Sequence, residues 1–136
     1  MTLSEAKAAV VDDFSMFDEW LDKYEYIIEL GKKLEPFPES MKTEDRLIRG
    51  CQSRVWLDCS VSGDALVFRA DSDAIITKGI ICLLIGVYSG RTPAEILSDD
   101  FGWVSEIGLK ENLSPTRAGG LASMISTIKA CAAAHE

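Results

Sequence analysis

The sequence predicts an α+β fold in which a small antiparallel β-sheet packs against several helices. Three observations predict this class. Apolar residues recur at helical spacing between positions 17 and 28. From position 54 the period changes to two and continues through a turn into a second strand. Beyond position 74 the pattern is helical again, and a helix, a hairpin and further helices without a linker form one packed unit.

The first predicted helix runs to Gly31. The segment SMFD, residues 15–18, resembles a capping box at its start. Pro36 and Pro38 then make the following segment a loop. The apolar positions of this helix are Phe17, Trp20, Leu21, Tyr24, Ile27 and Ile28.

Two strands follow, joined by a hairpin turn at Ser62-Gly63-Asp64. In the first strand, alternate residues share a face. One face carries Val55, Leu57, Cys59 and Val61, and the other carries Arg54, Trp56, Asp58 and Ser60. The second strand is predicted over residues 65–70.

The remaining chain is predicted to be helical. Asp71-Ser72-Asp73 supplies the N-cap of a helix over residues 74–88, whose apolar residues surround the axis, so this is the buried core helix. Gly90 ends it. Thr92-Pro93 opens a short helix, and a second short helix is expected over residues 103–107. Ser114-Pro115 begins the last helix, whose inner stripe is Leu121, Met124, Ile125 and Ile128.

Length and charge limit the function classes. A chain of 136 residues predicts a single domain, residues 1–136. The net charge of −8, spread along the chain, argues against nucleic acid and anionic membrane surfaces as partners. The first 14 residues lack the basic and apolar regions of an export signal, and the longest apolar run, residues 79–87, is too short to cross a bilayer. We therefore expect a soluble, cytoplasmic protein with small-molecule or protein partners.

The four cysteines are expected to be free thiols, because the cytoplasm is reducing. Their positions, 51, 59, 82 and 131, contain no CxxC pair, and His135 is the only histidine. We therefore expect no structural zinc site and no bound metal. Cys59 shares the apolar face of its strand, Cys82 lies within the apolar helix, and Cys131 lies near the end of the last helix, so all three are interpreted as structural.

Cys51 is different, because it precedes the alternating pattern and no core face includes it. Gly50 permits unusual backbone angles beside it. Arg46, Arg49 and Arg54 lie nearby, and cations favour a thiolate. The residues alone leave open whether Cys51 is a reactive thiol or one more structural cysteine. With no histidine base and no partner cysteine at hand, sulfur-to-sulfur exchange is the chemistry that suits it.

Four segments together resemble the SufE family of sulfur acceptors for cysteine desulfurases. GCQSRVW is specific for this group, and the DSDAxxxKG pattern follows about 20 residues later, by count along the sequence. In the related acceptor of the Csd desulfurase the loop tends to read GCENRVW, so GCQS points to the Suf branch. The four segments are WLDKYEYIIELG, IRGCQSRVWL, ADSDAIITKGIICLL and LSPTRAGGL.

The resemblance implies a function for Cys51 in iron–sulfur cluster assembly. In the family this cysteine accepts persulfide sulfur from a partner desulfurase, here SufS- or CsdA-like, and carries it to a scaffold complex, here SufBCD-like. In the family, the thiol of this cysteine is sheltered from solvent at rest and extends when the partner desulfurase binds. We expect no cofactor, because the chain lacks the residues that would bind pyridoxal phosphate or a metal. No independent turnover is expected, and a homodimer is left open. Supporting residues carried over are Gly50, Gln52, Ser53, Asp71, Ser72, Asp73 and Arg117.

Some of these residues also have ordinary structural interpretations. Asp71 to Asp73 would be a helix cap, and Arg117 a surface residue in a first helical turn. For Gly50 we expect a hinge, so that Gly50→Val leaves the fold nearly intact and slows sulfur acceptance. The alternative is a left-handed turn, in which valine costs about 1 kcal/mol or more.

Two other functions remain open from the sequence. SufE proteins resemble the IscU-type scaffold in architecture, and a scaffold holds a cluster with several convergent thiolates. The third function is a non-covalent adaptor that activates the desulfurase by binding it. Substitution of Cys51 separates an acceptor from an adaptor.

Overall fold

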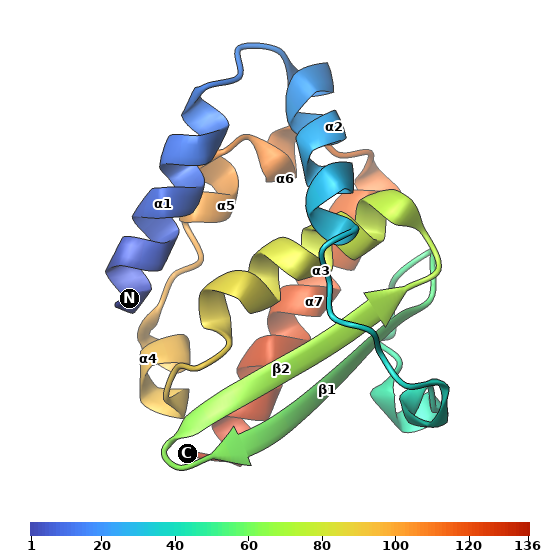
Figure 1. Cartoon of the computed structure of the whole chain (residues 1–136), viewed down its shortest axis with the longest axis vertical. Coiled ribbons are helices and arrows are strands. Elements are labelled where there is room, and N and C mark those ends of the chain that lie inside the picture. The colour runs from blue at the N-terminus through green and yellow to red at the C-terminus, as the bar shows by residue number, and fades with distance from the viewer.

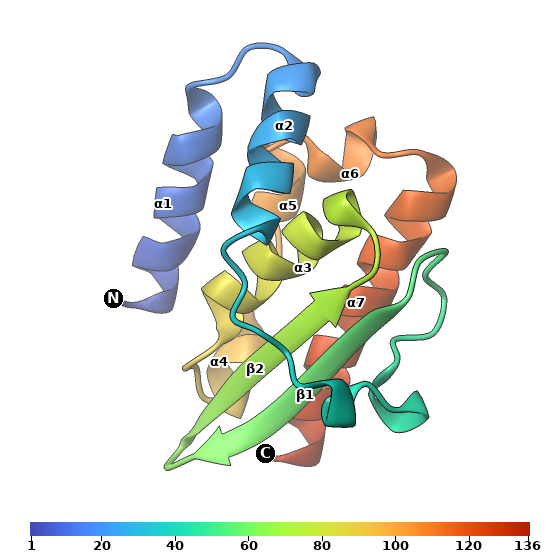
Figure 2. The same ribbon diagram turned by 45° about the vertical axis from the view of Figure 1, so that its right-hand side comes forward.

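The computed structural model describes residues 1–136 and confirms the α+β class. Figures 1 and 2 show the hairpin on one side of the molecule and the helices on the other, with α3 between them. The two strands form one antiparallel sheet. The elements are α1 (Leu3–Ser15), α2 (Trp20–Gly31), two 3-10 turns η1 (Glu39–Met41) and η2 (Glu44–Arg46), β1 (Val55–Ser62), β2 (Ala65–Ser72), α3 (Ile75–Tyr88), α4 (Pro93–Ser98), α5 (Trp103–Glu106), α6 (Leu109–Asn112) and α7 (Pro115–Ala134).

Helix α1 has no counterpart among the predicted elements. It begins with a capping box between Thr2 and Glu5. The capping box predicted at residues 15–18 is wrong, because the Ser15 hydroxyl donates to the Asp12 carbonyl at the end of α1. Helix α2 starts at Trp20 without a side-chain cap.

The hairpin confirms the predicted turn, with Gly63 at a φ of +62° between the paired strands. Strand β2 continues to Ser72, which pairs with Val55. The prediction that residues 71–73 cap the next helix is therefore wrong, and α3 has Ala74 as an N-cap without a side-chain hydrogen bond. The predicted alternation in β1 holds only in part, since Trp56 is buried as well as its neighbours.

Helix α3 is the buried core helix, as predicted. It packs against α1, α2, α7 and β2. At the crossing with α2, a Cβ on Gly79 would lie 2.1 Å from the Ile27 carbonyl oxygen, so only glycine permits this approach. Ile75, at the first turn, is 67% exposed, contrary to the pattern of the rest of the helix.

The predicted later helices are confirmed by α4, α5 and α7. Thr92 and Glu95 form a capping box at α4, and the Ser114 hydroxyl accepts from the Arg117 amide at the start of α7. The short α6 was not predicted. No helix is both long enough and apolar enough to cross a membrane.

Candidate functional site

The loop between η2 and β1 carries Cys51 and is fastened where it enters the sheet. The Ile48 amide donates to the Val55 carbonyl at 2.8 Å. At Arg54, the backbone amide donates to Asp73 Oδ1 at 3.0 Å and the carbonyl accepts from the Ser72 hydroxyl at 2.8 Å. The loop is thus anchored at residues 48 and 54, and Cys51 lies between the two anchors.

Cys51 is half-buried against the first half of α7. Its Sγ lies 3.6 Å from the Gly120 carbonyl oxygen, to which the thiol donates. A Cβ on Gly120 would lie 3.4 Å from the same sulfur. A cavity of about 40 Å³ adjoins the thiol, enough for a group the size of a water molecule. It is lined by Cys51, Gln52, Ser53, Thr77, Ile80, Thr116, Arg117, Gly120 and Met124.

Burial raises the pKa of the Cys51 thiol above its ordinary value. The expectation that neighbouring arginines favour the thiolate is therefore wrong for this state. Arg46 instead forms an ion pair with Asp58, with Nε 3.0 Å from Oδ1. At neutral pH the sheltered thiol is protonated, which protects it from oxidation and alkylation.

Gly50 adopts a φ of +92°, a left-handed conformation that favours glycine. A Cβ at this position would lie 2.4 Å from Ser123 Oγ on α7. The expectation that valine leaves the fold nearly intact is therefore wrong, and the left-handed turn is the conformation present.

Three of the expected supporting residues lie around the same cavity as the thiol. They are Gln52 and Ser53 from the loop and Arg117 from the first turn of α7. The Arg117 guanidinium also donates to the Tyr24 hydroxyl at 3.4 Å. The structure thus brings the loop, α2 and α7 together at this point.

The three residues Asp71, Ser72 and Asp73, at the end of β2 and just beyond it, have two different roles. Ser72 and Asp73 hold Arg54 and so position the end of the loop. The Asp71 carboxylate points to Lys42 and Lys78, at 3.3 and 3.4 Å, and does not line the cavity. Burial raises the pKa of Asp71, but hydrogen bonds from the Ser72 amide and the two lysines outweigh burial and hold it below its usual range.

Apart from Arg117, the cavity residues that come from helices were not predicted from the sequence as site residues; they are Thr77, Ile80, Thr116, Gly120 and Met124. Of these, Met124 belongs to the predicted inner stripe of the last helix, which gives it no role at a site. A weak signal existed for Gly120, because two consecutive glycines inside a predicted helix are costly and indicate a close approach.

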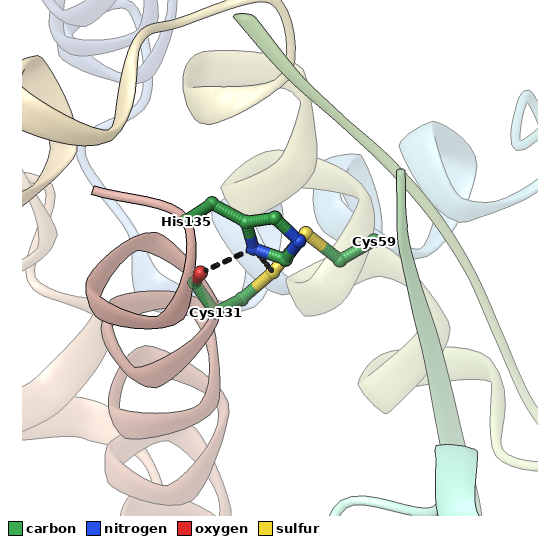
Figure 3. Close-up of side chains that lie close together, drawn as sticks. All are labelled: Cys59, Cys131 and His135. Atoms are coloured by element: carbon green, nitrogen blue, oxygen red, sulfur yellow. Dashed lines mark hydrogen bonds between the residues drawn. A yellow bond between two sulfur atoms is a disulfide. The ribbon is translucent and has the colours of Figure 1, made fainter. Parts of the chain in front are cut away.

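The expectation of four free thiols is wrong for Cys59 and Cys131, which form a disulfide with a Cα–Cα distance of 6.9 Å (Figure 3). Cys59 does lie beside the core, as its strand face predicted, but that face meets the end of α7. Cys82 is free and half-buried, and its thiol donates to the Leu30 carbonyl at 3.3 Å.

Comparison with known proteins identifies a family. Residues 8–132 match the SufE family, described as an Fe-S metabolism associated domain. An uncharacterized SufE-like protein of Rhizobium meliloti (strain 1021) is 43% identical over 125 residues, covering 88% of this chain and 89% of the relative. One from Rhizobium etli is 42% identical over 125 residues, covering 88% of this chain and 84% of the relative.

A solution structure of a hypothetical protein from Thermus thermophilus is similar in fold, with a TM-score of 0.78 and 20% identity. The alignment covers 96% of this chain and 95% of that chain. At this identity the likeness shows the fold alone. The family match and the two rhizobial relatives show more, and the chain belongs to the SufE family.

Proposed function

We propose that this protein is a sulfur acceptor, in which Cys51 takes persulfide sulfur from a partner cysteine desulfurase and delivers it for iron–sulfur cluster assembly. The observation that carries the proposal is the position of this thiol. It lies on a loop, anchored on both sides, next to a cavity with room for one more small group. Cys82, the other free thiol, lies within a helix and donates to a neighbouring helix.

The chemistry is thiol–persulfide exchange. The Cys51 thiolate attacks the outer sulfur of the desulfurase persulfide, the S–S bond in the desulfurase breaks, and a new S–S bond forms on Cys51. The desulfurase cysteine leaves as a thiolate and takes up the proton that Cys51 has lost, so no outside oxidant or reductant is needed. Because burial raises the pKa of Cys51, the loop must bring the thiol out of its cavity, where deprotonation becomes easier.

The cavity supports a second part of the proposal, the protection of the carried sulfur. A persulfide exposed to solvent is lost to reductants or oxidised further. When the loop returns, the outer sulfur would occupy the space beside Gly120, where Thr77, Thr116 and Arg117 offer polar groups. Ser72 and Asp73 would act through Arg54 by holding the end of the loop.

A cluster scaffold is less well supported. A scaffold needs several thiolates that converge on one cluster. Cys59 and Cys131 are joined to each other, and the one group of three clustered ligand side chains in the chain does not include Cys51. Stimulation of the desulfurase by binding alone is the remaining alternative, and it predicts a different response to substitution.

The test compares Cys51→Ser with Cys82→Ser, a matched change at the other free thiol. Each variant is mixed with a SufS- or CsdA-like desulfurase and cysteine, and the rate of alanine formation is measured. We expect Cys51→Ser to lose the stimulation and Cys82→Ser to keep it. If Cys51→Ser stimulates as the wild type does, the protein is an adaptor. A SufBCD-like scaffold is the proposed recipient, and transfer of labelled sulfur from Cys51 to it checks that step.

A further inference from the structure

We propose that Cys59, Cys131 and His135 form a binding site for a thiophilic divalent metal ion, with Zn²⁺ as the fitting ion, once their disulfide is reduced. Figure 3 shows the three side chains together where the end of α7 meets β1. The site is separate from the sulfur-acceptor loop. Cys131 lies about 16 Å further along α7 than Gly120, at the helical rise per residue.

The three side chains form a suitable donor set. Their ligand atoms all lie within 4.8 Å of one another. Cys131 and His135 are four residues apart, so they share one face of the helix end, and the imidazole ring lies beside the Cys131 sulfur, with the non-ligand nitrogen Nδ1 3.9 Å from Sγ. Zinc binds thiolate sulfur at about 2.3 Å and imidazole nitrogen at about 2.0 Å, so two tetrahedral ligands lie roughly 3.5–4 Å apart.

The orientation of His135 supports a ligand role. Its Nδ1 lies 2.9 Å from the Cys131 carbonyl oxygen. Since a carbonyl oxygen can only accept, Nδ1 carries the proton in this hydrogen bond and Nε2 keeps a free lone pair. A hydrogen bond from one ring nitrogen to a backbone carbonyl is the usual support for a metal-binding histidine, because it fixes the ring and its tautomer. In the proposed site Nε2 is therefore the ligand nitrogen.

The backbone keeps the two sulfurs close after reduction. Cys59 is held in the β1–β2 ladder opposite Phe68. Cys131 lies between Ile128 and Ala132, both fully buried, so this end of α7 is packed in the core. The reduced thiols therefore remain neighbours. The fold positions the ligands before the ion binds, so metal binding does not have to drive folding of the site.

The metal and the disulfide are mutually exclusive, because a disulfide sulfur has no thiolate to offer. A dithiol reductant supplies two electrons and two protons, which convert the crosslink to two thiols, while the reductant itself becomes a disulfide. Binding of the ion then displaces the two protons. Three protein ligands leave a fourth position for water. In a reducing compartment the ion would fasten α7 to β1 as the disulfide does under oxidising conditions.

The expectation of no metal site rested on the absence of a CxxC pair and on a single histidine. Such motifs detect metal ligands only where they lie close together in the sequence. Here one ligand comes from a strand and two come from a helix end, and the two cysteines are 72 positions apart in the sequence.

The test uses a Cys51→Ser/Cys82→Ser background, which removes the two thiols outside the site. The protein is reduced with dithiothreitol, freed of reductant without oxygen and titrated with Co²⁺. We expect one equivalent to bind, with a thiolate-to-cobalt charge-transfer band and the intense visible bands of tetrahedral cobalt, all abolished by Zn²⁺. We also expect Zn²⁺ to raise the melting temperature of the reduced protein and not that of the oxidised protein.

Two further variants in that background locate the ligands. His135→Ala changes an exposed side chain outside the core, so the fold is retained, and we expect cobalt affinity to fall about tenfold or more. Cys59→Ser should reduce the charge-transfer band, since one thiolate is lost. A reduced protein that binds no cobalt, or one whose affinity and spectrum are unchanged in both variants, would overturn the proposal.

Discussion

Gly50→Ala tests whether the acceptor loop is held in its resting conformation by a left-handed glycine packed against α7. Alanine at a φ of +92° adopts a backbone conformation that L-residues rarely occupy, which costs about 1–3 kcal/mol. The new Cβ would lie 2.4 Å from Ser123 Oγ, a distance that the two atoms cannot keep. Ser123 has to rotate, and it loses the hydrogen bond to the Gly119 carbonyl, worth about 1 kcal/mol.

The two costs can be separated with Ser123→Ala. That substitution removes the clashing hydroxyl, and the remaining contact of the new Cβ with Ser123 Cβ, at 3.4 Å, is ordinary. We expect Gly50→Ala alone to lower the free energy of unfolding by about 2–4 kcal/mol. In the Ser123→Ala background the same change should cost about 1 kcal/mol less, because only the backbone strain remains.

Urea denaturation of the four proteins in this cycle gives the free energies of unfolding. The rate of persulfide formation, measured on the folded fraction, shows whether the strained loop leaves its cavity more or less readily. A cost below about 0.5 kcal/mol for Gly50→Ala would show that the loop adopts the strained angle without difficulty, which contradicts the resting geometry. An equal cost in both backgrounds would contradict the contact with Ser123.

Three further predictions concern pH and crosslinking. Burial raises the pKa of Cys51, so alkylation of this thiol by iodoacetamide should have its midpoint at a higher pH in the native protein than in the unfolded chain, and an equal or lower midpoint contradicts this. The stability that the protonated thiol contributes below its unfolded pKa should be lost as the pH rises through its folded pKa. The Cys59→Ser/Cys131→Ser variant, which opens a loop spanning 72 residues, should unfold with about 4 kcal/mol less free energy in urea, and an unchanged midpoint contradicts a constraining crosslink. Burial raises the pKa of Asp99, but hydrogen bonds, that from Lys7 first among them, outweigh it and hold the pKa low. Asp99→Asn should therefore cost about 2 kcal/mol at neutral pH and remove part of the stability that the wild type loses as pH falls through the folded pKa, and an acid limb identical to that of the wild type would contradict this.

The elements that the sequence predicted are those with strong local patterns. The core helix α3 is apolar on all sides, and the Gly63-Asp64 turn joins two alternating segments, so neither needs distant information. Helix α1 was missed because its pattern is weak. It buries only Ala6 and Phe14, and most of its remaining residues are small or acidic. The cap at residues 71–73 failed because pairing with β1 extends the strand through Ser72.

The sequence also predicted part of the candidate site, again from local information. Cys51 was identifiable because it lies outside any periodic pattern, and the family resemblance then assigned its chemistry. Its shelter depends on Gly120 and Thr77, which approach only when α7 and α3 pack, and no spacing in the sequence encodes that distance. The partner of Cys59 was hidden in the same way, because the crossing of α7 and β1 determines which two cysteines meet.

The most direct test of sulfur acceptance is a map of where the sulfur goes. The protein is mixed with its desulfurase and cysteine, alkylated to trap persulfides, digested and examined by mass spectrometry. The proposal predicts one added sulfur atom on the peptide that carries Cys51, lost on treatment with dithiothreitol before alkylation. Sulfur found instead on Cys59, Cys82 or Cys131, or no sulfur on Cys51 under turnover, would contradict it.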